Sequence, residues 1–521
     1  MKKIYIFLLA ASTLWCNTAC DSLDLTSEST ISGDGYWQNK DQFEAFHTGL
    51  ASYFRGHTYT CFVYGEGRSN IYGDTPFGGE APQGIEVLYN NTLSVTTPGI
   101  SNYGGLYNSI NQINLMIAKA EESTVLTDAE KSEYLGEAYG LRAYLYFQLL
   151  RSYGDVIIYT DYTSGSTLDL GNLARKQDPA EKVMEQIKSD IAASETAYAD
   201  NYQFMNGKNF WSLGATKMLK GDVYLWSGKQ MGGGASDYQT AKDALEDVKK
   251  CPGIGLEANY ANVFSYSNKK NKEIIFSIYY AEGEDLMFGG YQWRNNFMPQ
   301  QAYMTNGGYY TESGENVRDT KDAEINGLIR FSLKRDLYNK LYLDSDPRKR
   351  INLRGVYTKN AESGALEYLA AYPYKFQGTM LSGGSERSWY DDFPIYRYAD
   401  CLLMLAEAKA LLGEDITAEI NEVRTRAYGG NLPAEAAYPN DKGSFYDGNE
   451  FVGGDENPIE AVLKERLREL IFEGKRWYDI RLMGVAEKYS TAVGSKLLWP
   501  VDEGTLTDNN ALVQTPGYGV Q

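Results

Sequence analysis

Apolar residues recur at helical spacing through most of the first 250 residues. Two runs of apolar residues are spaced three or four positions apart. The first is Leu106, Ile110, Ile113 and Ile117, and the second is Tyr134, Ala138, Leu141, Leu145 and Leu149. Such a stripe marks the buried face of an amphipathic helix. Short turns, such as the Gly-rich turn at 232–234, separate the predicted helices. The pattern therefore predicts antiparallel helix pairs stacked in a TPR-like manner within about 40–250, although the strict TPR residue pattern is absent.

The predicted helices carry recognisable end signals. Asp178 precedes Pro179, and Glu181 follows three residues after Asp178. This arrangement resembles a capping box with Pro at the first helical position, so we expect Asp178 to be the N-cap. At the other end of the chain, Gly413 follows the apolar run 398–412 and is expected to be a helix C-cap.

A different pattern occupies the middle of the chain. The run Glu273–Tyr280, rich in Ile and aromatics, predicts a strand. Residues 281–394 are rich in Gly, Asn and Tyr and predict a long loop-rich region, and such regions are often binding loops. Helical spacing returns within about 395–485, where Leu463, Leu467, Leu470 and Ile471 form one buried stripe. The expected fold class is mostly α, with little β structure.

The first 35 residues predict export and anchoring. Lys2 and Lys3 precede the apolar run 4–11, which indicates a secretory signal peptide over 1–19. The sequence NTAC before and including Cys20 resembles a bacterial lipobox, from which Asn17 departs, because an aliphatic residue is usual there. We expect Cys20 to be lipidated and 20–35, which is polar and acidic, to be a tether. The remaining residues, 36–521, are expected to form one domain.

Composition narrows the classes of function. The 521 residues carry a formal net charge of −19, which argues against a nucleic-acid partner. The 43 Tyr outnumber the 19 Phe and 8 Trp together, and Tyr suits surfaces that are part apolar and part hydrated, as sugar-binding surfaces are. Most of these Tyr are nevertheless expected to pack between helices. Cys61, Cys251 and Cys401 follow the tether, so one disulfide is possible, and burial as small apolar residues is the simpler expectation.

No catalytic motif accompanies these features. His47 and His57 are the two histidines, and the sequence holds no zinc-protease helix, phosphate loop, Cys-x-x-Cys or nucleophile elbow. The 69 acidic residues leave a glycosidase carboxylate pair open. The stretch FEGKRWYDIRL, 472–482, supplies no nucleophile with its base, so we expect it to be architectural, with Trp477 in the core.

Five stretches together resemble one family. They are ERLRELIFEGKRWYDIRLMG at 465–484, YRYADCLLMLAEAKAL at 396–411, LRAYLYFQLLRSYGDVIIYT at 141–160, ATKMLKGDVYLWSGK at 215–229 and LLWPVDEGTLTDNNALVQTPGY at 497–518. In their order along the chain, they resemble the SusD-like (RagB/SusD) outer-membrane lipoproteins. The resemblance implies a helical SusD-like fold with a loop-rich ligand-binding face, a lipid anchor facing the cell exterior, and no catalysis. It also implies capture of a glycan, or of a peptide as in some relatives, for a SusC-like TonB-dependent transporter.

The family motifs are scaffold, so binding residues must come from the loops. Tyr291, Trp293, Arg294 and Asn295 form the densest grouping of aromatic and polar residues there. An exposed ring beside Arg and Asn can stack on a sugar and bond its hydroxyls, whereas a buried Trp293 would only pack its own loop. Further candidates on loops are Tyr72, Asp74, Tyr89, Tyr309 and Trp389.

Metal and cofactor expectations are few. No cofactor is expected. Asp344 and Asp346, and the run Asp508–Asn510, offer oxygens that a structural calcium ion can use, but neither matches an EF-hand loop. Hydrated turns are the alternative for both.

Overall fold

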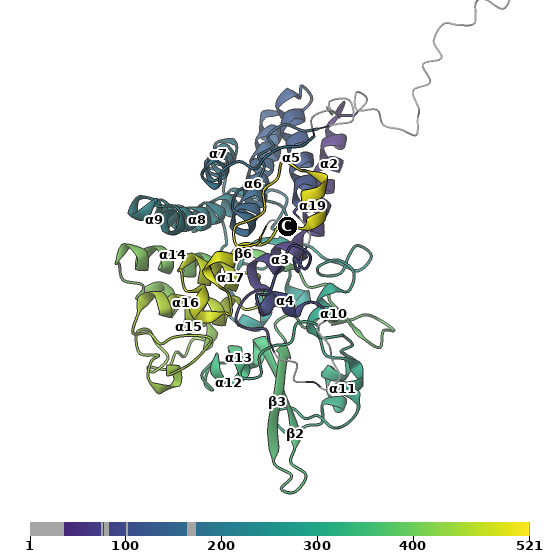
Figure 1. The fold of residues 1–521 in the computed structure, drawn as a ribbon, viewed down its shortest axis with the longest axis vertical. Helices are drawn as coiled ribbons and strands as arrows, with labels where there is room; N and C mark the ends of the chain where they lie inside the picture. The colour runs from purple at the N-terminus through teal and green to yellow at the C-terminus, as the bar shows by residue number, and fades with distance from the viewer. Residues whose placement is uncertain (1–35, 74–76, 78–82, 101–102, 164–172, 520–521) are drawn as a thin grey trace, which may run out of the picture.

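The computed structural model describes residues 36–73, 77, 83–100, 103–163 and 173–519, and Figure 1 shows their arrangement. Helices account for 48% and strands for 8% of the chain, which confirms the predicted mostly α fold. The predicted signal peptide, the tether and Cys20 lie outside the described residues, so their assignments remain predictions. No helix of the described part is long and apolar enough to cross a membrane.

The first half of the chain forms a stack of helices, as the apolar spacing predicted. From α5 onward each helix packs against the next, so that α5 to α9 follow one another in space as they do in sequence. The helices of this half are α2 Lys40–Gly56, α3 Thr58–Glu66, α4 Glu86–Tyr89, α5 Gly105–Glu122, α6 Asp128–Tyr153, α7 Ala180–Tyr198, α8 Leu213–Gln230 and α9 Gly234–Val248.

A second helical region continues this stack from a distant part of the sequence. Helix α9 packs against α14, and α14 packs in turn against α15 and α16 (Figure 1). The helices of this region are α14 Tyr398–Leu412, α15 Thr417–Ala427, α16 Pro458–Leu470, α17 Arg476–Leu482, α18 Ala486–Tyr489 and α19 Glu503–Asp508.

The middle of the chain is loop-rich, with short elements. Its helices are α10 Gln292–Phe297, α11 Gln301–Thr305, α12 Leu337–Lys340 and α13 Arg348–Asn352. Its strands are β1 Ile274–Ile278, β2 Leu353–Lys359, β3 Leu366–Pro373, β4 Thr379–Met380, β5 Arg387–Ser388 and β6 Phe393–Arg397. They pair as three two-stranded antiparallel sheets, β1 with β6, β2 with β3 and β4 with β5. The predicted strand is β1, and its pairing with β6 closes the loop-rich region onto the helices.

One predicted helix cap is wrong and another is confirmed. Helix α7 begins at Ala180 with Pro179 as N-cap, and the Asp178 side chain instead accepts a hydrogen bond from Ile158 N at 2.8 Å. Asp155, from the preceding loop, accepts the hydrogen bond of Ala180 N at 2.8 Å. The capping carboxylate therefore comes from another segment. Gly413 closes α14 in the left-handed conformation, as predicted.

Helix α16 is buried on its charged face as well as on its apolar face. The predicted apolar stripe is buried, and so are all the remaining side chains from Ala461 to Leu470, including the charged ones. Acidic and basic residues of neighbouring segments match the charged side chains of α16, and we call the whole set the buried charge network. Its members are Glu273, Asp346, Asp441, Asp455, Glu465, Glu469 and Glu473, with Arg348, Lys375, Arg397, Arg424, Arg426, Lys464 and Arg468.

The buried charge network joins the loop-rich region to α16. Arg397, at the end of β6, pairs with Glu273 and Glu469 at 2.7 Å and with Glu473 at 2.8 Å. Burial opposes ionisation of Glu469, but the nearby guanidinium groups lower the pKa of its carboxyl well below the ordinary range. Because each buried charge has opposite partners, removing one partner leaves an uncompensated charge, which is strongly destabilising.

The stretch 472–482 is architectural, as predicted. Most of it forms α17, in which the Trp477 side chain is fully buried. Arg476 donates to the carbonyl of Phe451 at 2.7 Å, and Asp479 accepts from Arg466 at 2.9 Å. The polar groups of α17 therefore join it to neighbouring segments.

Candidate ligand-binding surface

Three residues predicted to stack on a ligand would need an exposed ring, and the structure buries all three rings. Trp293 is 0% exposed, Tyr72 1% and Trp389 3%. Tyr72 donates its hydroxyl to Glu66 at 3.0 Å, and Trp389 donates its indole N–H to the carbonyl of Phe376 at 3.0 Å. Each of the three rings is therefore part of the core, and none can stack on a ligand in this conformation.

Trp293 is buried because α10 turns it inward onto aromatic side chains, two of them local and three from distant segments. Its ring centroid lies 4.8–6.5 Å from those of Phe62, Phe288, Phe297, Phe376 and Phe472. The crevice that Trp293 and Trp389 both line has a volume of about 10 Å³, room for one water molecule at most. Of the two expectations for Trp293, the structure agrees with the one in which its side chain packs its own loop.

Tyr291 and Arg294 remain at the surface, close to each other. The Tyr291 side chain is 56% exposed, and the Arg294 guanidinium lies 4.3 Å from the centroid of its ring. Glu386 fixes Arg294 through an ion pair of 3.1 Å and also accepts from Asn326 at 2.7 Å. Tyr291 is thus an aromatic ring accessible to solvent and supported by a cation on a positioned side chain.

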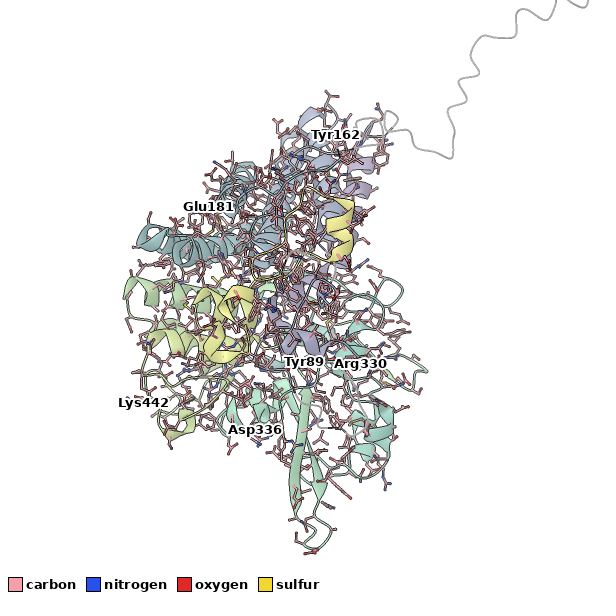
Figure 2. The ribbon with its side chains drawn as sticks, in the orientation of Figure 1. Tyr89, Tyr162, Glu181, Arg330, Asp336 and Lys442 are labelled. Carbon is pink, nitrogen blue, oxygen red and sulfur yellow. The ribbon has the colours of Figure 1, made fainter. Side chains whose placement is uncertain are left out.

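The other predicted residues are less accessible or lie elsewhere. Asn295, next to Arg294 on α10, is half-buried. Tyr89 is half-buried at the end of α4 (Figure 2), and Tyr309 is half-buried with its ring centroid 5.9 Å from that of Phe77. Asp74 lies outside the described residues. Of the predicted residues, Tyr291 and Arg294 are thus the pair that stays at the surface, while Trp293 and Trp389 line the crevice beneath them.

Three tyrosines that the candidate set omitted form a chain of neighbours that ends at Tyr291. Burial raises the pKa of Tyr390, and so do its acidic neighbours, which include Glu282, Tyr291 and Tyr266. The pKa of Tyr279 is raised by burial and by neighbours that include Tyr266. Tyr390 therefore lies near both Tyr291 and Tyr266, and Tyr279 lies near Tyr266. We call these four residues the tyrosine surface.

Lys269 connects two members of the tyrosine surface. Its ammonium group lies 4.9 Å from the ring centroid of Tyr266 and 4.7 Å from that of Tyr279. An ion pair of 3.0 Å with Asp392 holds the same ammonium group in place.

The sequence held one signal that could have identified Tyr279 as a surface residue. Tyr279 and Tyr280 are adjacent at the end of a strand, and alternate strand residues face opposite sides, so one of the two should face outward. Tyr280 is fully buried and Tyr279 is half-buried.

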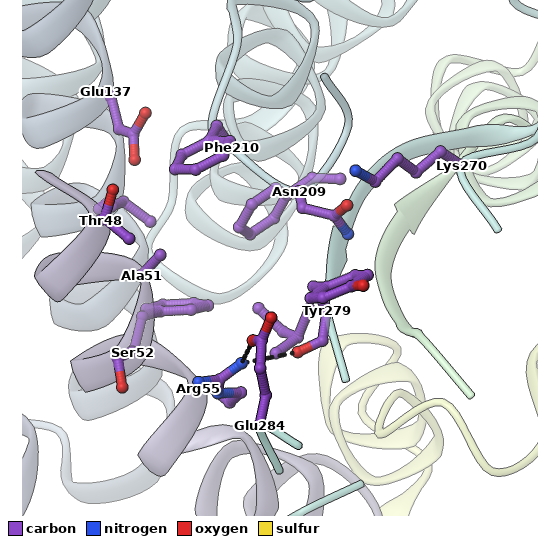
Figure 3. A pocket seen from close by; sticks show the side chains of 14 residues that line it. Thr48, Ala51, Ser52, Arg55, Glu137, Asn209, Phe210, Lys270, Tyr279 and Glu284 are labelled. Atoms are coloured by element: carbon purple, nitrogen blue, oxygen red, sulfur yellow. Dashed lines mark hydrogen bonds and ion pairs between the residues drawn. The ribbon is translucent and has the colours of Figure 1, made fainter. Parts of the chain in front are cut away.

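Two hollows flank the tyrosine surface. The first, beside Tyr266, has a volume of about 490 Å³, and we call it the polar hollow because charged and polar side chains dominate its lining. Those side chains include Lys321, Lys375, Gln377, Thr379, Arg387 and Asp391. Burial raises the pKa of Asp391 to about 7, although Gly378 N donates to its carboxylate at 3.1 Å. The second hollow, of about 260 Å³, includes Tyr279 in its lining and is drawn in Figure 3.

The tyrosine surface combines apolar ring faces with hydrogen-bonding groups. The expectation of a structural calcium ion concerns other residues. Among the described residues, no group of three or more His, Cys, Asp and Glu is placed to hold a metal ion. Lys349 pairs with Asp344 at 2.7 Å, and Arg348 pairs with Asp346 at 2.8 Å, so the partners of these two carboxylates are basic side chains of the same turn.

Cys61, Cys251 and Cys401 are all buried free thiols, so no disulfide joins any two of them.

Comparisons with known proteins define the class of this chain. A model of the SusD family matches residues 191–492, more than half of the chain, and a model described as "Starch-binding associating with outer membrane" matches residues 83–209. The chain therefore belongs to the SusD family. These are surface glycan-binding proteins associated with the outer membrane, and they bind without catalysis.

Three similar proteins illustrate the relationship. The structure of B. fragilis NanU is 52% identical, covers 95% of this chain and 100% of its own, and superposes with a TM-score of 0.89. A SusD superfamily protein from Bacteroides vulgatus is 53% identical, covers 93% and 100%, and has a TM-score of 0.88. SusD-like protein P38 from Formosa agariphila is 24% identical over 99% of both chains.

Proposed function

We propose that this protein captures oligosaccharide or polysaccharide outside the cell and delivers it, uncleaved, to a SusC-like TonB-dependent transporter. Lipidation of Cys20 would anchor the chain at the outer membrane, and the acidic segment 20–35 would tether the fold to that anchor. The observation that carries the proposal is the tyrosine surface beside the polar hollow. Its rings offer faces for the C–H groups of sugars, and the adjoining side chains offer partners for hydroxyls.

The chemistry of the surface supports a hydrated, polyhydroxylated ligand. Polar atoms dominate the lining of the polar hollow, and both signs of charge are present around the rings. Such a surface disfavours a wholly apolar ligand, because charged side chains would lose hydration without gaining partners. A peptide with polar side chains is the second candidate that the family resemblance left open, and it belongs among the ligands to be tested.

The test is calorimetry of the chain from residue 36 onward against starch, laminarin, a uronic-acid-rich polysaccharide and a mixed peptide digest. The expected result is binding of at least one glycan, with no shortening of that glycan on prolonged incubation. Tyr266→Ala and Tyr291→Ala should weaken it. Tyr53→Ala is the matched control, because Tyr53 is 50% exposed on α2 and lies outside the tyrosine surface. Binding to peptides alone, or equal binding by all variants, would contradict the proposal.

The transporter is tested separately. Affinity purification of the full-length lipoprotein from detergent-extracted outer membranes should recover a TonB-dependent barrel in stoichiometric amount. A Cys20→Ala variant should fail to fractionate with the outer membrane while retaining glycan binding. Unchanged membrane fractionation of this variant would refute the lipid anchor without affecting the glycan assignment.

A further inference from the structure

The hollow in Figure 3 is distinct from the polar hollow and has the features of a small-molecule site. Its cavity of about 260 Å³ lies between α2, α6, the segment before α8, and the end of β1. Buried apolar side chains form its floor, among them Phe54, Leu141 and Phe276. Phe210 and Tyr279, both half-buried, are aromatic parts of its wall. Ligand pockets of drug-sized molecules start at about 300 Å³, so this cavity suits one ring.

Hydroxyl-bearing and cationic side chains open onto the cavity. Thr48, Ser52 and Lys270 line it and are exposed, so they can exchange hydrogen bonds with a ligand. Asn209 belongs to the wall: its amide donates to the carbonyl and hydroxyl oxygens of Ser277, each at 3.0 Å, and to Asp392 at 3.3 Å.

Partners hold three of the ionisable side chains around the same space. Arg55 pairs with Glu284 at 2.9 Å and donates to the carbonyl of Tyr279 at 3.2 Å, as the dashed lines in Figure 3 show. Glu137 accepts from His47 at 2.8 Å from beneath the wall. Arg55 thus has a carboxylate beside it and Glu137 an imidazole, and the cavity combines aromatic rings with hydrogen-bonding groups without one dominant charge.

We propose that this cavity binds one pyranose residue, with the ring against Phe210 and Tyr279 and the sugar hydroxyls bonded to the exposed side chains of Thr48, Ser52 and Lys270. The inference rests on the proposed function for its biological setting, because Tyr279 belongs both to this cavity and to the tyrosine surface. A chain end held in the cavity continues across Tyr279 onto the tyrosine surface. Recognition of a chain end is therefore the specificity that this site adds to the capture of a glycan.

Binding of free sugars tests the cavity directly. Saturation-transfer NMR of the chain from residue 36 onward uses glucose, galactose, mannose, N-acetylglucosamine and galacturonate at millimolar concentration. At least one sugar should give a transfer signal. Ala51→Trp should abolish it, because Ala51 lines the cavity from α2 and a large side chain there fills the space. Ala45→Trp is the matched control, since Ala45 is exposed on the same helix and does not line the cavity.

A second variant keeps the test decisive if Ala51→Trp folds poorly. Phe210→Ala removes one aromatic wall and should weaken the affinity for the same sugar at least fivefold. The absence of a signal from all five sugars in the wild type, or a signal that persists in both cavity variants, overturns the inference. Polysaccharide binding, measured on the same samples, reports on the proposed function independently. Signals that the cavity variants abolish, in a protein that binds no polysaccharide, would sustain the cavity and remove the capture function.

Discussion

Two residues on the same short helix turn should have opposite roles. Trp293→Ala is expected to destabilise the fold and leave the tyrosine surface able to bind, whereas Tyr291→Ala is expected to leave the fold intact and weaken glycan binding. The Trp293 side chain is fully buried, and that of Tyr291 is 56% exposed. Only two positions separate them, so composition and loop context are the same for both.

The size of the Trp293 effect follows from its burial. A buried aromatic side chain removes roughly 150–250 Å² from water, and at about 25 cal/mol per Å² this amounts to about 4–6 kcal/mol. Measured Trp and Phe to Ala changes in cores cost about 3–5 kcal/mol, so ~4 kcal/mol is a consistent expectation. At about 2.1 cal/mol/K per residue, the unfolding entropy of a chain of this size is about 1 kcal/mol/K, and Tm should fall by ~4 °C.

The indole N–H of Trp293 provides a control. It has no hydrogen-bond partner among the described residues, so Trp293→Phe removes an unsatisfied donor along with some packing. We expect this variant to lose less than half of what Trp293→Ala loses. For Tyr291→Ala we expect a change in unfolding free energy within about 0.5 kcal/mol and a loss of about 1 kcal/mol in binding, about fivefold in Kd.

The assay combines thermal and urea unfolding of the three variants with calorimetry against the best glycan ligand. A Trp293→Ala protein with unchanged Tm and abolished binding would refute the reasoning, since it would make Trp293 a contact of the ligand. A Tyr291→Ala protein that unfolds several degrees earlier would refute the other half, because an exposed side chain cannot carry that much burial energy.

Three further predictions concern the core. Glu469→Gln leaves buried guanidinium groups unpaired and should lower the unfolding free energy by about 3–5 kcal/mol in urea titrations, and an unchanged midpoint would contradict this. Burial raises the pKa of Glu407 to about 8, so this group stabilises the fold at low pH and loses that contribution as pH rises from about 5 to 8. The unfolding free energy of Glu407→Gln should therefore rise relative to that of the wild type by ~1.4 kcal/mol per pH unit in that window. A difference that does not change with pH would exclude the raised pKa of Glu407. Burial raises the pKa of Cys61 and Cys251 to about 12 and also raises that of Cys401, so these three thiols should react with Ellman's reagent only after unfolding, a pattern that rapid labelling of the native protein would disprove.

Local features of the sequence determined the elements and the family. The apolar stripes of α5, α6 and α16 were readable because a helix repeats its faces every 3.6 residues, whatever surrounds it. The strand at β1 and the C-cap at Gly413 were readable for the same reason, since backbone conformation at those positions depends on nearby residues. The family motifs belong to this scaffold, which is why they identified the fold and its class and gave no ligand contacts.

Only the tertiary structure decided which polar and aromatic residues face water. Helix α16 carries charges on one face, which predicts solvent, yet distant carboxylate and guanidinium groups meet those charges and bury them. The carboxylate that accepts from the first turn of α7 belongs to Asp155, because the chain returns there, which no local pattern indicates. Trp293 is inside and Tyr291 outside because the distant residues Phe62, Phe376 and Phe472 join the local Phe288 and Phe297 around the Trp293 ring. Burial depends on what the folded chain brings from elsewhere, so a single stretch of sequence predicts periodicity well and exposure poorly.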